Sequence, residues 1–343
     1  MLAASAAFAA LSACSPSDPV PSPRPNGSFL AVGDTGEPWG ALPSLFEPQL
    51  AVGHALARAH AASPTDAFVL LGDNFYPDGL TEDAVLSRVV ENVALPYCAF
   101  VRPSRELERA LAGACEPPPD PPPLYAVIGN HDVRAAESPD LQRTRVPQLV
   151  TNWEVPTTDA PAVRELPGGL SLIFVVSESP WGEAETGALA DALRRTRGPF
   201  RVIVGHRPPI TGHPQLSDMV RNAARRAGIP VHAYVAGHVH VLGAIPSAVP
   251  GAAPALTVIA GSGAHAELQT STEYRIDAPH FLEASVGFVR FDTFLDEPEA
   301  TLQVTLYRVA PLPLIARFRA PEIAARYAID LAGEVSNGAT TAE

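Results

Sequence analysis

Five short motifs decide the fold of this chain, and they follow one another in a fixed order. They are VGDTG at 32–36, LGDNFY at 71–76, IGNHD at 128–132, VIVGH at 202–206 and AGHVH at 236–240. Each motif stands where an apolar run with strand character gives way to glycine and polar residues, so each delivers its side chains to the carboxyl end of a strand. In an open α/β sheet that edge is where ligands bind.

The polar side chains of these motifs are carboxylate, phenol, amide and imidazole groups, which suit hard or borderline metal ions. A single GD or HxH string means little, because glycine beside Asp or Asn is ordinary turn chemistry. Five such motifs in order are far harder to obtain by chance, and together they indicate a metal site. The residues concerned are Asp34, Asp73, Asn74, Tyr76, Asn130, His131, Asp132, His206, His238 and His240.

The motif set resembles that of the calcineurin-like metallophosphoesterases, and within them the small, tartrate-resistant purple acid phosphatases, over residues 28–318. The general family pattern begins with Asp-x-His, whereas here the first motif has Gly36 in place of the histidine. Tyr76, three residues after Asp73, is what the purple acid phosphatase pattern places in that coordination position. The lost histidine and the tyrosine occur together, which favours this subfamily.

The resemblance implies two metal ions bridged by the carboxylate of Asp73, which can donate one oxygen to each ion. The first ion would take Asp34, Asp73, Tyr76 and His240, and the second would take Asn130, His206 and His238. A phenolate is anionic and favours a trivalent ion. Iron(III) is therefore expected beside Tyr76, with iron(II), zinc or manganese opposite, because a mixed nitrogen and oxygen site does not select among these by affinity alone.

The activity that the resemblance implies is hydrolysis of phosphate monoesters by attack of a metal-bound hydroxide, as in acid phosphatases. Two cations about 3.5 to 4 Å apart can orient a phosphate ester and acidify a bound water. The leaving alcohol needs a proton, and His131 is the first candidate to give it, with Asp132 holding the imidazole in the useful tautomer. His213 is the second candidate, because small purple acid phosphatases carry another histidine shortly after the VxGH motif.

Two further residues have a substrate-binding interpretation beside a structural one. Asn74, next to the bridging carboxylate, orients solvent or phosphate, or it caps the turn. Arg207, directly after His206, contacts phosphate through its guanidinium or lies solvated at the surface. Of the other histidines, His232 lies in the strand run VHAYVAG and is expected to be buried. His265 follows the glycines of GSGAH, and it either contacts substrate or has only a role in the turn.

The first residues of the chain indicate where the protein acts. Residues 1–13, MLAASAAFAALSA, form an uncharged apolar run before Cys14 and resemble a bacterial lipoprotein signal peptide. The run is too short to span a bilayer as a helix. Lipidation of Cys14 would anchor the protein to a membrane face in the periplasm or at the cell surface, with the Pro/Ser-rich segment 14–27 as an extended spacer. An ordinary secretory peptide or a disordered terminus is the alternative.

The two remaining cysteines, Cys98 and Cys115, form an even pair. In an oxidising compartment a disulfide between them is permitted, and two buried free thiols are the alternative. Both lie in the segment 81–123, which is longer than small relatives need. We interpret this segment as an insertion near the site that shapes substrate access.

The strand pattern predicts one α/β domain over residues 28–320. Early strand runs alternate with helical patterns, whereas the last three, VGFVRFDTF, LQVTLYRV and LIARFRA, follow one another as a meander. The tail 321–343 contains PEIAARYAIDLAGEV, which has the pattern of a short helix. The architecture that the resemblance implies, a four-layer α-β-β-α sandwich of two mixed sheets, accommodates both patterns.

Charge and motifs together leave three functions open. The net charge of −13 argues against a nucleic-acid partner, since no basic stripe exists to meet a phosphate backbone. The first function is a phosphomonoesterase acting on a small phosphorylated substrate. The second is a phosphodiesterase or nucleotide pyrophosphatase on the same metal core, which only the walls of the substrate pocket distinguish from the first. The third is a non-catalytic binding lipoprotein, which loss of ligand residues would favour.

Overall fold

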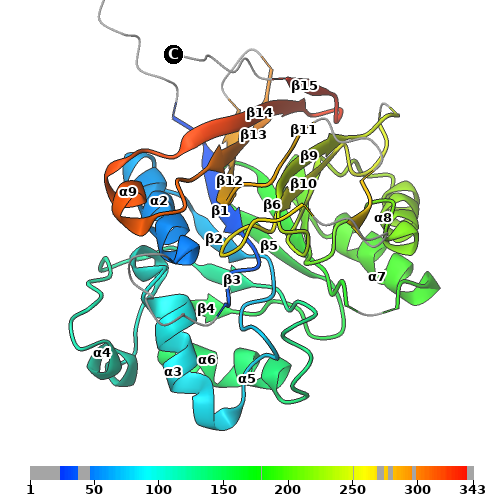
Figure 1. Ribbon diagram of the computed structural model, residues 1–343. Helices are drawn as coiled ribbons and strands as arrows, with labels where there is room; N and C mark the ends of the chain where they lie inside the picture. Colours follow the sequence, from blue (N-terminus) through cyan, green and yellow to red (C-terminus); the bar gives the residue numbers. More distant parts are fainter. Residues whose placement is uncertain are drawn as a thin grey trace, which may run out of the picture.

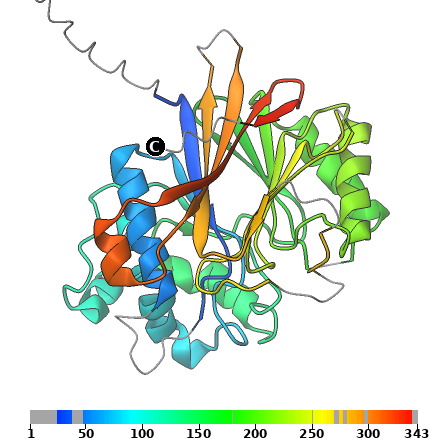
Figure 2. The same ribbon diagram turned by 45° about the horizontal axis from the view of Figure 1, so that its top comes forward.

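The computed structural model describes residues 24–37, 47–178, 180–249, 251–268, 274–276, 281–295 and 299–337. Within these residues the strands form two mixed sheets, one of eight strands and one of seven. The sheets pack face to face, with helices on the two outer faces (Figures 1 and 2). The predicted four-layer α-β-β-α sandwich is thus confirmed.

The eight-stranded sheet contains the first three motif strands. Strands β1 to β4 run parallel to one another, and β12 pairs with β1 antiparallel to begin the C-terminal meander. The spatial order is β15-β14-β13-β12-β1-β2-β3-β4. The strands are β1 (Gly27–Val32), β2 (Ala67–Leu70), β3 (Leu124–Ala126), β4 (Trp153–Glu154), β12 (Gly287–Phe294), β13 (Thr301–Arg308), β14 (Glu322–Asp330) and β15 (Val335–Asn337).

The seven-stranded sheet contains the other two motif strands. Strands β6, β7, β8 and β10 run parallel, while β5, β9 and β11 pair antiparallel with their neighbours. The spatial order is β11-β9-β10-β8-β7-β6-β5. The strands are β5 (Ala162–Leu166), β6 (Leu170–Phe174), β7 (Phe200–Val204), β8 (Ala233–Ala236), β9 (Leu242–Pro246), β10 (Leu256–Ala260) and β11 (Phe281–Glu283).

The layers follow from the two-residue period of the strands. In β1, Phe29 faces the cluster between the two sheets, where its ring stacks on Phe291 at 4.5 Å, whereas Leu30 faces the outer cluster. Both faces of this strand are therefore buried, as the continuous apolar run predicts. Helix α2 (Pro48–Ala62) covers the outer face of the eight-stranded sheet. Helices α7 (Glu183–Arg194) and α8 (Pro214–Ala227) cover the other outer face.

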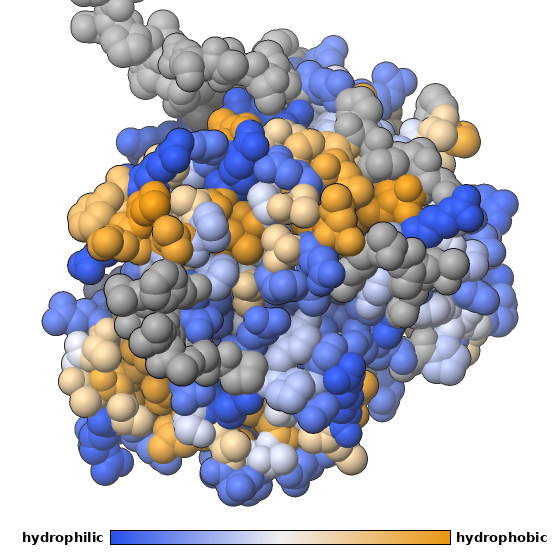
Figure 3. Space-filling model, in the orientation of Figure 1, coloured by the Kyte–Doolittle hydropathy of each residue, from blue (hydrophilic) through white to orange (hydrophobic). Residues whose placement is uncertain are grey.

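The prediction of a strand for LIARFRA is wrong, because Pro313–Phe318 forms helix α9 and the next strand begins at Glu322. Pro313 stands in the first helical turn, where its missing N–H leaves no hydrogen bond unmade. The helix packs on α2 and buries only one side, so Leu314 and Phe318 are 63% and 74% exposed. Figure 3 shows apolar surface gathered over this helix.

The tail after residue 320 also differs from the prediction. The expected short helix is instead strand β14, followed by β15, and the sheet continues past the expected end of the domain. Alternate residues Ala325, Tyr327 and Ile329 face the cluster between the sheets. This period of two fits an edge of a half-buried sheet, and packing against it overrides the helical propensity of the alanines.

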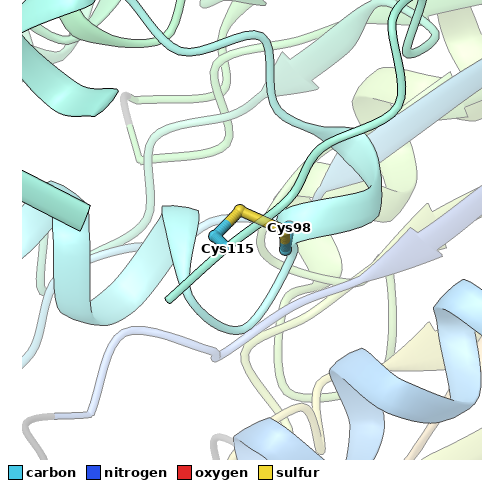
Figure 4. The surroundings of a disulfide bond; sticks show 2 residues. All are labelled: Cys98 and Cys115. Atoms are coloured by element: carbon cyan, nitrogen blue, oxygen red, sulfur yellow. A yellow bond between two sulfur atoms is a disulfide. The ribbon is translucent and has the colours of Figure 1, made fainter. Parts of the chain in front are cut away.

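The segment 81–123 lies against β2 and β3 and packs into the outer cluster of the eight-stranded sheet. It contains α3 (Val85–Val89), a π-helical turn at Val90–Ala94 and α4 (Arg105–Leu111); the helices that follow β3 are α5 (Ser138–Thr144) and α6 (Val146–Leu149). Cys98 and Cys115 form a disulfide with their Cα atoms 5.7 Å apart (Figure 4), which confirms the predicted pairing. Such a loop closure contributes about 3 kcal/mol in the chain-entropy model.

The lipoprotein prediction falls outside the described residues. Residues 1–23, which include Cys14 and the apolar stretch before it, lie outside them, so lipidation stays a prediction. Within the part of the chain that the structure describes, no helix has the length and apolar character needed to cross a bilayer.

Candidate metal centre

The five motifs meet at one edge of the molecule, where the parallel strands of both sheets end. The loops after β1, β2 and β3 come from the eight-stranded sheet, and the loops after β7 and β8 come from the seven-stranded sheet (Figure 1). Backbone hydrogen bonds tie these loops together, for example from Asp34 N to Gly72 O at 3.0 Å and from Gly237 N to His206 O at 3.0 Å. The polar side chains of the motifs are thereby held across the gap between the sheets.

Three of the predicted ligands adopt a strained backbone. Asp34, Asp73 and His238 have φ angles of 57°, 52° and 68°, in the left-handed region that side chains rarely adopt. Such strain persists only where the surroundings enforce it, and it gathers at functional sites. All three strained residues therefore lie in loops that follow motif strands.

Two positions in the motifs require glycine, because a carboxylate from another loop lies against the backbone there. A Cβ atom on Gly129 would lie 2.2 Å from Asp73 Oδ1, and one on Gly237 would lie 2.5 Å from Asp34 Oδ2. Neither carboxylate could keep its place beside a larger residue. The glycine before each polar residue in GN and GH therefore makes room for the carboxylates of other loops.

A first group of donors surrounds the hydroxyl of Tyr76. This oxygen lies 3.0 Å from Asp34 Oδ1, 2.9 Å from Asp73 Oδ2 and 3.2 Å from His240 Nε2. His240 Nε2 is also 3.3 Å from Asp34 Oδ1. The four residues that the sequence assigned to the first metal thus converge on one small volume.

A second group lies on the other side of Asp73. His206 Nε2 is 3.1 Å from Asn130 Oδ1 and 3.5 Å from Asp73 Oδ1, while its Nδ1 lies 2.8 Å from the Leu71 carbonyl oxygen. That backbone contact fixes the ring and directs Nε2 into the group. The ring of His238 packs on that of His206 at 5.1 Å. Asp73 therefore presents one carboxylate oxygen to each group.

The charges of the cavity are unbalanced without a cation. Asp34 and Asp73 are each 1% exposed, and two anionic carboxylates this close repel each other. Burial lowers the pKa of His206, but the charges of Asp73 and Asp34 outweigh it and raise that pKa to about 9. Burial and the same carboxylates raise the pKa of Tyr76 far above its ordinary value. The cavity stabilises positive charge at the position between these groups.

The residues present fit a pair of metal ions. Carboxylate oxygens of Asp34 and Asp73 and a ring nitrogen of His206 all lie within 4.8 Å of one another and are buried. The donors are oxygen and imidazole nitrogen, the set that iron, zinc and manganese accept. Glycine cradles and backbone strain shape the cavity around them.

His131 lies at the open side of the first group. Its ring packs against Tyr76 at 4.2 Å, and its Nε2 is 4.0 Å from Asp73 Oδ2. Nδ1 donates to the carbonyl oxygen of Pro77 at 2.6 Å, so this backbone oxygen orients the imidazole. Asp132 was expected to orient this imidazole. That expectation is wrong, because the carboxylate of Asp132 accepts from backbone N–H groups instead.

Asp132 instead lies completely buried behind the loops. Its carboxylate accepts from the backbone N–H groups of Asn74, Phe75 and Gly129 at 2.9 to 3.1 Å. Burial and the charge of Asp73 raise its pKa to about 7, against those hydrogen bonds. Asp132 thus holds the loops after β2 and β3 together.

Asn74 belongs to the same buried network. Its amide nitrogen donates to Val127 O at 2.8 Å and to Gln142 Oε1 at 3.1 Å, and the residue is 1% exposed. The substrate contact weighed for Asn74 stays a prediction. The alternative of a structural role in the turn is the one that the contacts favour.

Arg207 lies at the second group and not on the solvated surface. Its Nε donates to Glu178 Oε2 at 2.9 Å, and its Nη1 lies 2.8 Å from His238 Nε2. Ser177 Oγ accepts from the backbone N–H of both His206 and Arg207, which seats this loop on the end of β6. Neither Ser177 nor Glu178 was predicted, since nothing in their sequence marks them.

The two remaining candidate histidines differ in burial. His213, just before α8, is buried, and its ring lies 5.6 Å from that of His238. His265 is exposed, lies 5.6 Å from the ring of His240 and pairs with Glu267 at 3.3 Å. His213 therefore lies beside the second group and His265 beside the first, both at the border of the centre.

Arg88 is a residue of the centre that sequence reasoning missed. Its Nη2 donates to Gly36 O at 3.0 Å and to Tyr76 O at 2.7 Å, while Asn92 Nδ2 donates to Glu37 O at 2.8 Å. The segment 81–123 thus clamps the loops that carry Asp34 and Tyr76. Asn92 lies in the π-helical turn, a feature that often marks functional regions. Its tertiary contacts have no signature in sequence.

Comparisons with known proteins agree with this geometry. A family model described as calcineurin-like phosphoesterase matches residues 27–242, which include all five motifs. No curated protein matches the chain. Among solved structures, it is similar to GAP50, the anchor in the inner membrane complex of Plasmodium, with a TM-score of 0.54 and 14% identity over 83% of this chain and 85% of that one. It is also similar to PhoD, with a TM-score of 0.52 and 13% identity over 94% and 73%. At these identities the likeness shows the fold.

Proposed function

The chain belongs to the calcineurin-like phosphoesterase family, and we propose that within it the protein is a phosphomonoesterase of the purple acid phosphatase type. Its substrate is a small phosphorylated molecule. The observation that carries this proposal is the hydroxyl of Tyr76, buried between the carboxylates of Asp34 and Asp73 at 3.0 and 2.9 Å. A tyrosine that served only packing would have no reason to direct its phenol between two anionic groups.

The proposed ligands are those of the two groups around Asp73. Asp34, Tyr76 and His240 would hold iron(III) together with Asp73, because a phenolate and two carboxylates balance a trivalent charge. Asn130, His206 and His238 would hold iron(II), zinc or manganese opposite. Bound there, the two ions neutralise phosphate charge and acidify water. The family implies two ions, and their identity is part of the proposal.

His131 is proposed as the proton donor to the leaving alcohol. Its Nδ1 proton is committed to Pro77 O, so Nε2 is the nitrogen that faces the cavity and carries the transferred proton. His213 stays the second candidate. Arg207, held by Glu178, is proposed as a phosphate contact, and Arg207→Gln should raise KM for a monoester more than it lowers kcat.

Parallel assays test the function. Purified protein loaded with iron and zinc is assayed on p-nitrophenyl phosphate and on bis-p-nitrophenyl phosphate. We expect a higher kcat/KM for the monoester. A preference for the bis-ester would replace the proposal by a phosphodiesterase. The absence of turnover on either ester by metal-loaded protein would leave the non-catalytic alternative.

We further propose that the protein is a lipoprotein outside the cytoplasm. The Cys98–Cys115 disulfide supports an oxidising compartment. Cys14 after the apolar run 1–13 supports lipidation there. Membrane fractionation tests the anchor: the natural chain should sediment with membranes, and Cys14→Ser should release it. Equal sedimentation of both would contradict the anchor.

A further inference from the structure

Arg134 stands at the mouth of the metal centre, two residues after the IGNHD motif. Its Nη2 lies 3.2 Å from His131 Nε2, and its Nη1 lies 3.2 Å from Pro77 O. The imidazole donates through Nδ1 to Pro77 O, so Nε2 is the ring nitrogen that Arg134 contacts, and a proton placed on Nε2 for the leaving alcohol displaces this contact. Arg134 thus contacts the same ring nitrogen that faces Asp73.

The three side chains form a path from the interior to solvent. The exposed fractions of the side chains of Asp73, His131 and Arg134 are 2%, 21% and 47%. Asp34 and His206, which also lie beside Asp73, are almost completely buried, whereas the side chain of His240 is 16% exposed. A phosphate ester that reaches the centre from this side therefore passes the guanidinium of Arg134.

The guanidinium is only weakly committed to the protein. Its acidic neighbour within the described residues, Asp78, lies at 3.5 Å and is 68% exposed, and such exposed pairs contribute little. Among the hydrogen bonds that the described residues make, Nη1 and Nη2 have partners, and a guanidinium carries five donors in a planar fork. Arg134 can therefore exchange these contacts for an anion at little cost.

We propose that Arg134 binds a terminal oxygen of the substrate phosphoryl group and thereby selects monoesters over diesters. The inference rests on the proposed function and names what sets its substrate class. A monoester is a dianion with three terminal oxygens, one more than a diester has, and the guanidinium would bind one of them. A diester has one negative charge and carries an ester oxygen with a bulky substituent in that place. The net charge of −13 repels a dianion at long range, and a guanidinium at the entrance offsets part of this repulsion.

A purely positioning role for Arg134 makes a different prediction. If the guanidinium only held His131 in place, its loss would weaken proton donation to the leaving group. The p-nitrophenyl mono- and diester share a leaving group that needs little protonation, so both activities would change by the same small factor. The ratio of the two activities separates the roles.

The experiment measures kcat/KM for p-nitrophenyl phosphate and bis-p-nitrophenyl phosphate in the natural protein, Arg134→Gln and Arg134→Lys. Loss of a charged hydrogen bond predicts a fall of about tenfold to a hundredfold for the monoester in Arg134→Gln, and less than about threefold for the diester. Arg134→Lys keeps the charge and should recover part of the monoester activity. Arg102→Gln is the matched control, because Arg102 is 46% exposed, pairs with Asp120 and lies away from the motifs.

Binding of inorganic phosphate gives a second readout that needs no turnover. Its Kd for the metal-loaded protein should rise by about tenfold or more in Arg134→Gln and stay unchanged in Arg102→Gln. Equal losses on both esters, or an unchanged phosphate Kd, would overturn the inference while leaving phosphomonoesterase activity intact. If the natural protein hydrolyses neither ester, the proposed function fails, and phosphate binding alone decides whether Arg134 recognises the anion.

Discussion

Two completely buried histidines lie at opposite ends of the strands of the seven-stranded sheet. The surroundings of the two histidines differ. His206 follows β7 at the carboxyl edge, and His232 precedes β8 at the opposite edge. Burial lowers the pKa of His232 to about 4. The same burial acts on His206, but the carboxylates of Asp73 and Asp34 reverse it and raise the pKa to about 9.

The hydrogen bonds of the two rings explain what the difference means. His232 Nδ1 accepts from Arg201 N at 3.1 Å and Nε2 donates to Leu331 O at 3.3 Å, so both nitrogens serve the backbone. His206 uses Nδ1 for the Leu71 carbonyl and directs Nε2 to the side chains of Asn130 and Asp73. Burial alone therefore does not identify a ligand. A candidate ligand is identified by a ring nitrogen that faces carboxylates and an amide oxygen.

The largest expected effect comes from the carboxylate shared by both groups. Asp73→Asn removes the charge that faces both groups, and we expect activity to fall on the order of a thousandfold with loss of bound metal. Turnover of p-nitrophenyl phosphate and metal content check this. Asp191→Asn, in an exposed pair on α7, is the control and should change neither. Full metal content with normal turnover in Asp73→Asn would refute the assignment of the metal centre to the carboxyl ends of these strands.

The next effect concerns the proton given to the leaving alcohol. His131→Gln should lower kcat about a hundredfold on glycerol phosphate, whose alkoxide needs a proton, and much less on p-nitrophenyl phosphate. Measured kcat values on both substrates check this. Equal losses on the two substrates would show that His131 does not donate that proton and would move the role to His213.

A smaller effect concerns the clamp formed by Arg88. Arg88→Lys keeps the charge but cannot span Gly36 O and Tyr76 O with one planar group, so the loops of Asp34 and Tyr76 should loosen. We expect metal binding to weaken about tenfold, as for other groups that orient ligands. Metal titration measures it, with Arg109→Lys on α4 as the control. Unchanged affinity would mean that the segment 81–123 does not position these loops.

Substitution of His232 should have the smallest effect on activity. It should instead change how the free energy of unfolding depends on pH. The His232 pKa of about 4 in the folded protein lies below the ordinary 6.5, so below pH 6.5 the unfolded chain binds a proton that the fold rejects. Stability should therefore fall as pH drops, by about 2 kcal/mol between pH 7.5 and 5 from this residue. Urea unfolding at both pH values should show a smaller loss in His232→Gln. The same loss in both proteins would contradict the assignment.

The carboxyl edge was largely predictable because each motif carries its own signal. A strand run, a glycine and a polar residue lie together in sequence, and parallel strands bring such ends to one edge. This accounts for the convergence of Asp34, Asp73 and Tyr76. Contacts between loops have no such signal, so the hydrogen bond from His131 to Pro77 and the clamp of Arg88 emerge only in three dimensions.

The C-terminal meander was predicted less well for a physical reason. The segments of α9 and β14 are short and carry both apolar and helix-favouring residues, so local propensity does not decide between helix and strand. The partner does: Tyr327 and Ile329 find the open edge of the sheet beside β13, whereas α9 packs on α2. Neither partner is visible from the segment alone.

The most direct measurement of the central claim is metal analysis with a visible spectrum of the purified protein, of Tyr76→Phe and of the control Tyr307→Phe. We predict iron beside Tyr76 with a tyrosinate-to-iron(III) charge-transfer band in the natural protein and in Tyr307→Phe, and loss of this band in Tyr76→Phe. A colourless, active protein with two zinc ions, whose metal content and activity do not respond to Tyr76→Phe, would contradict the account.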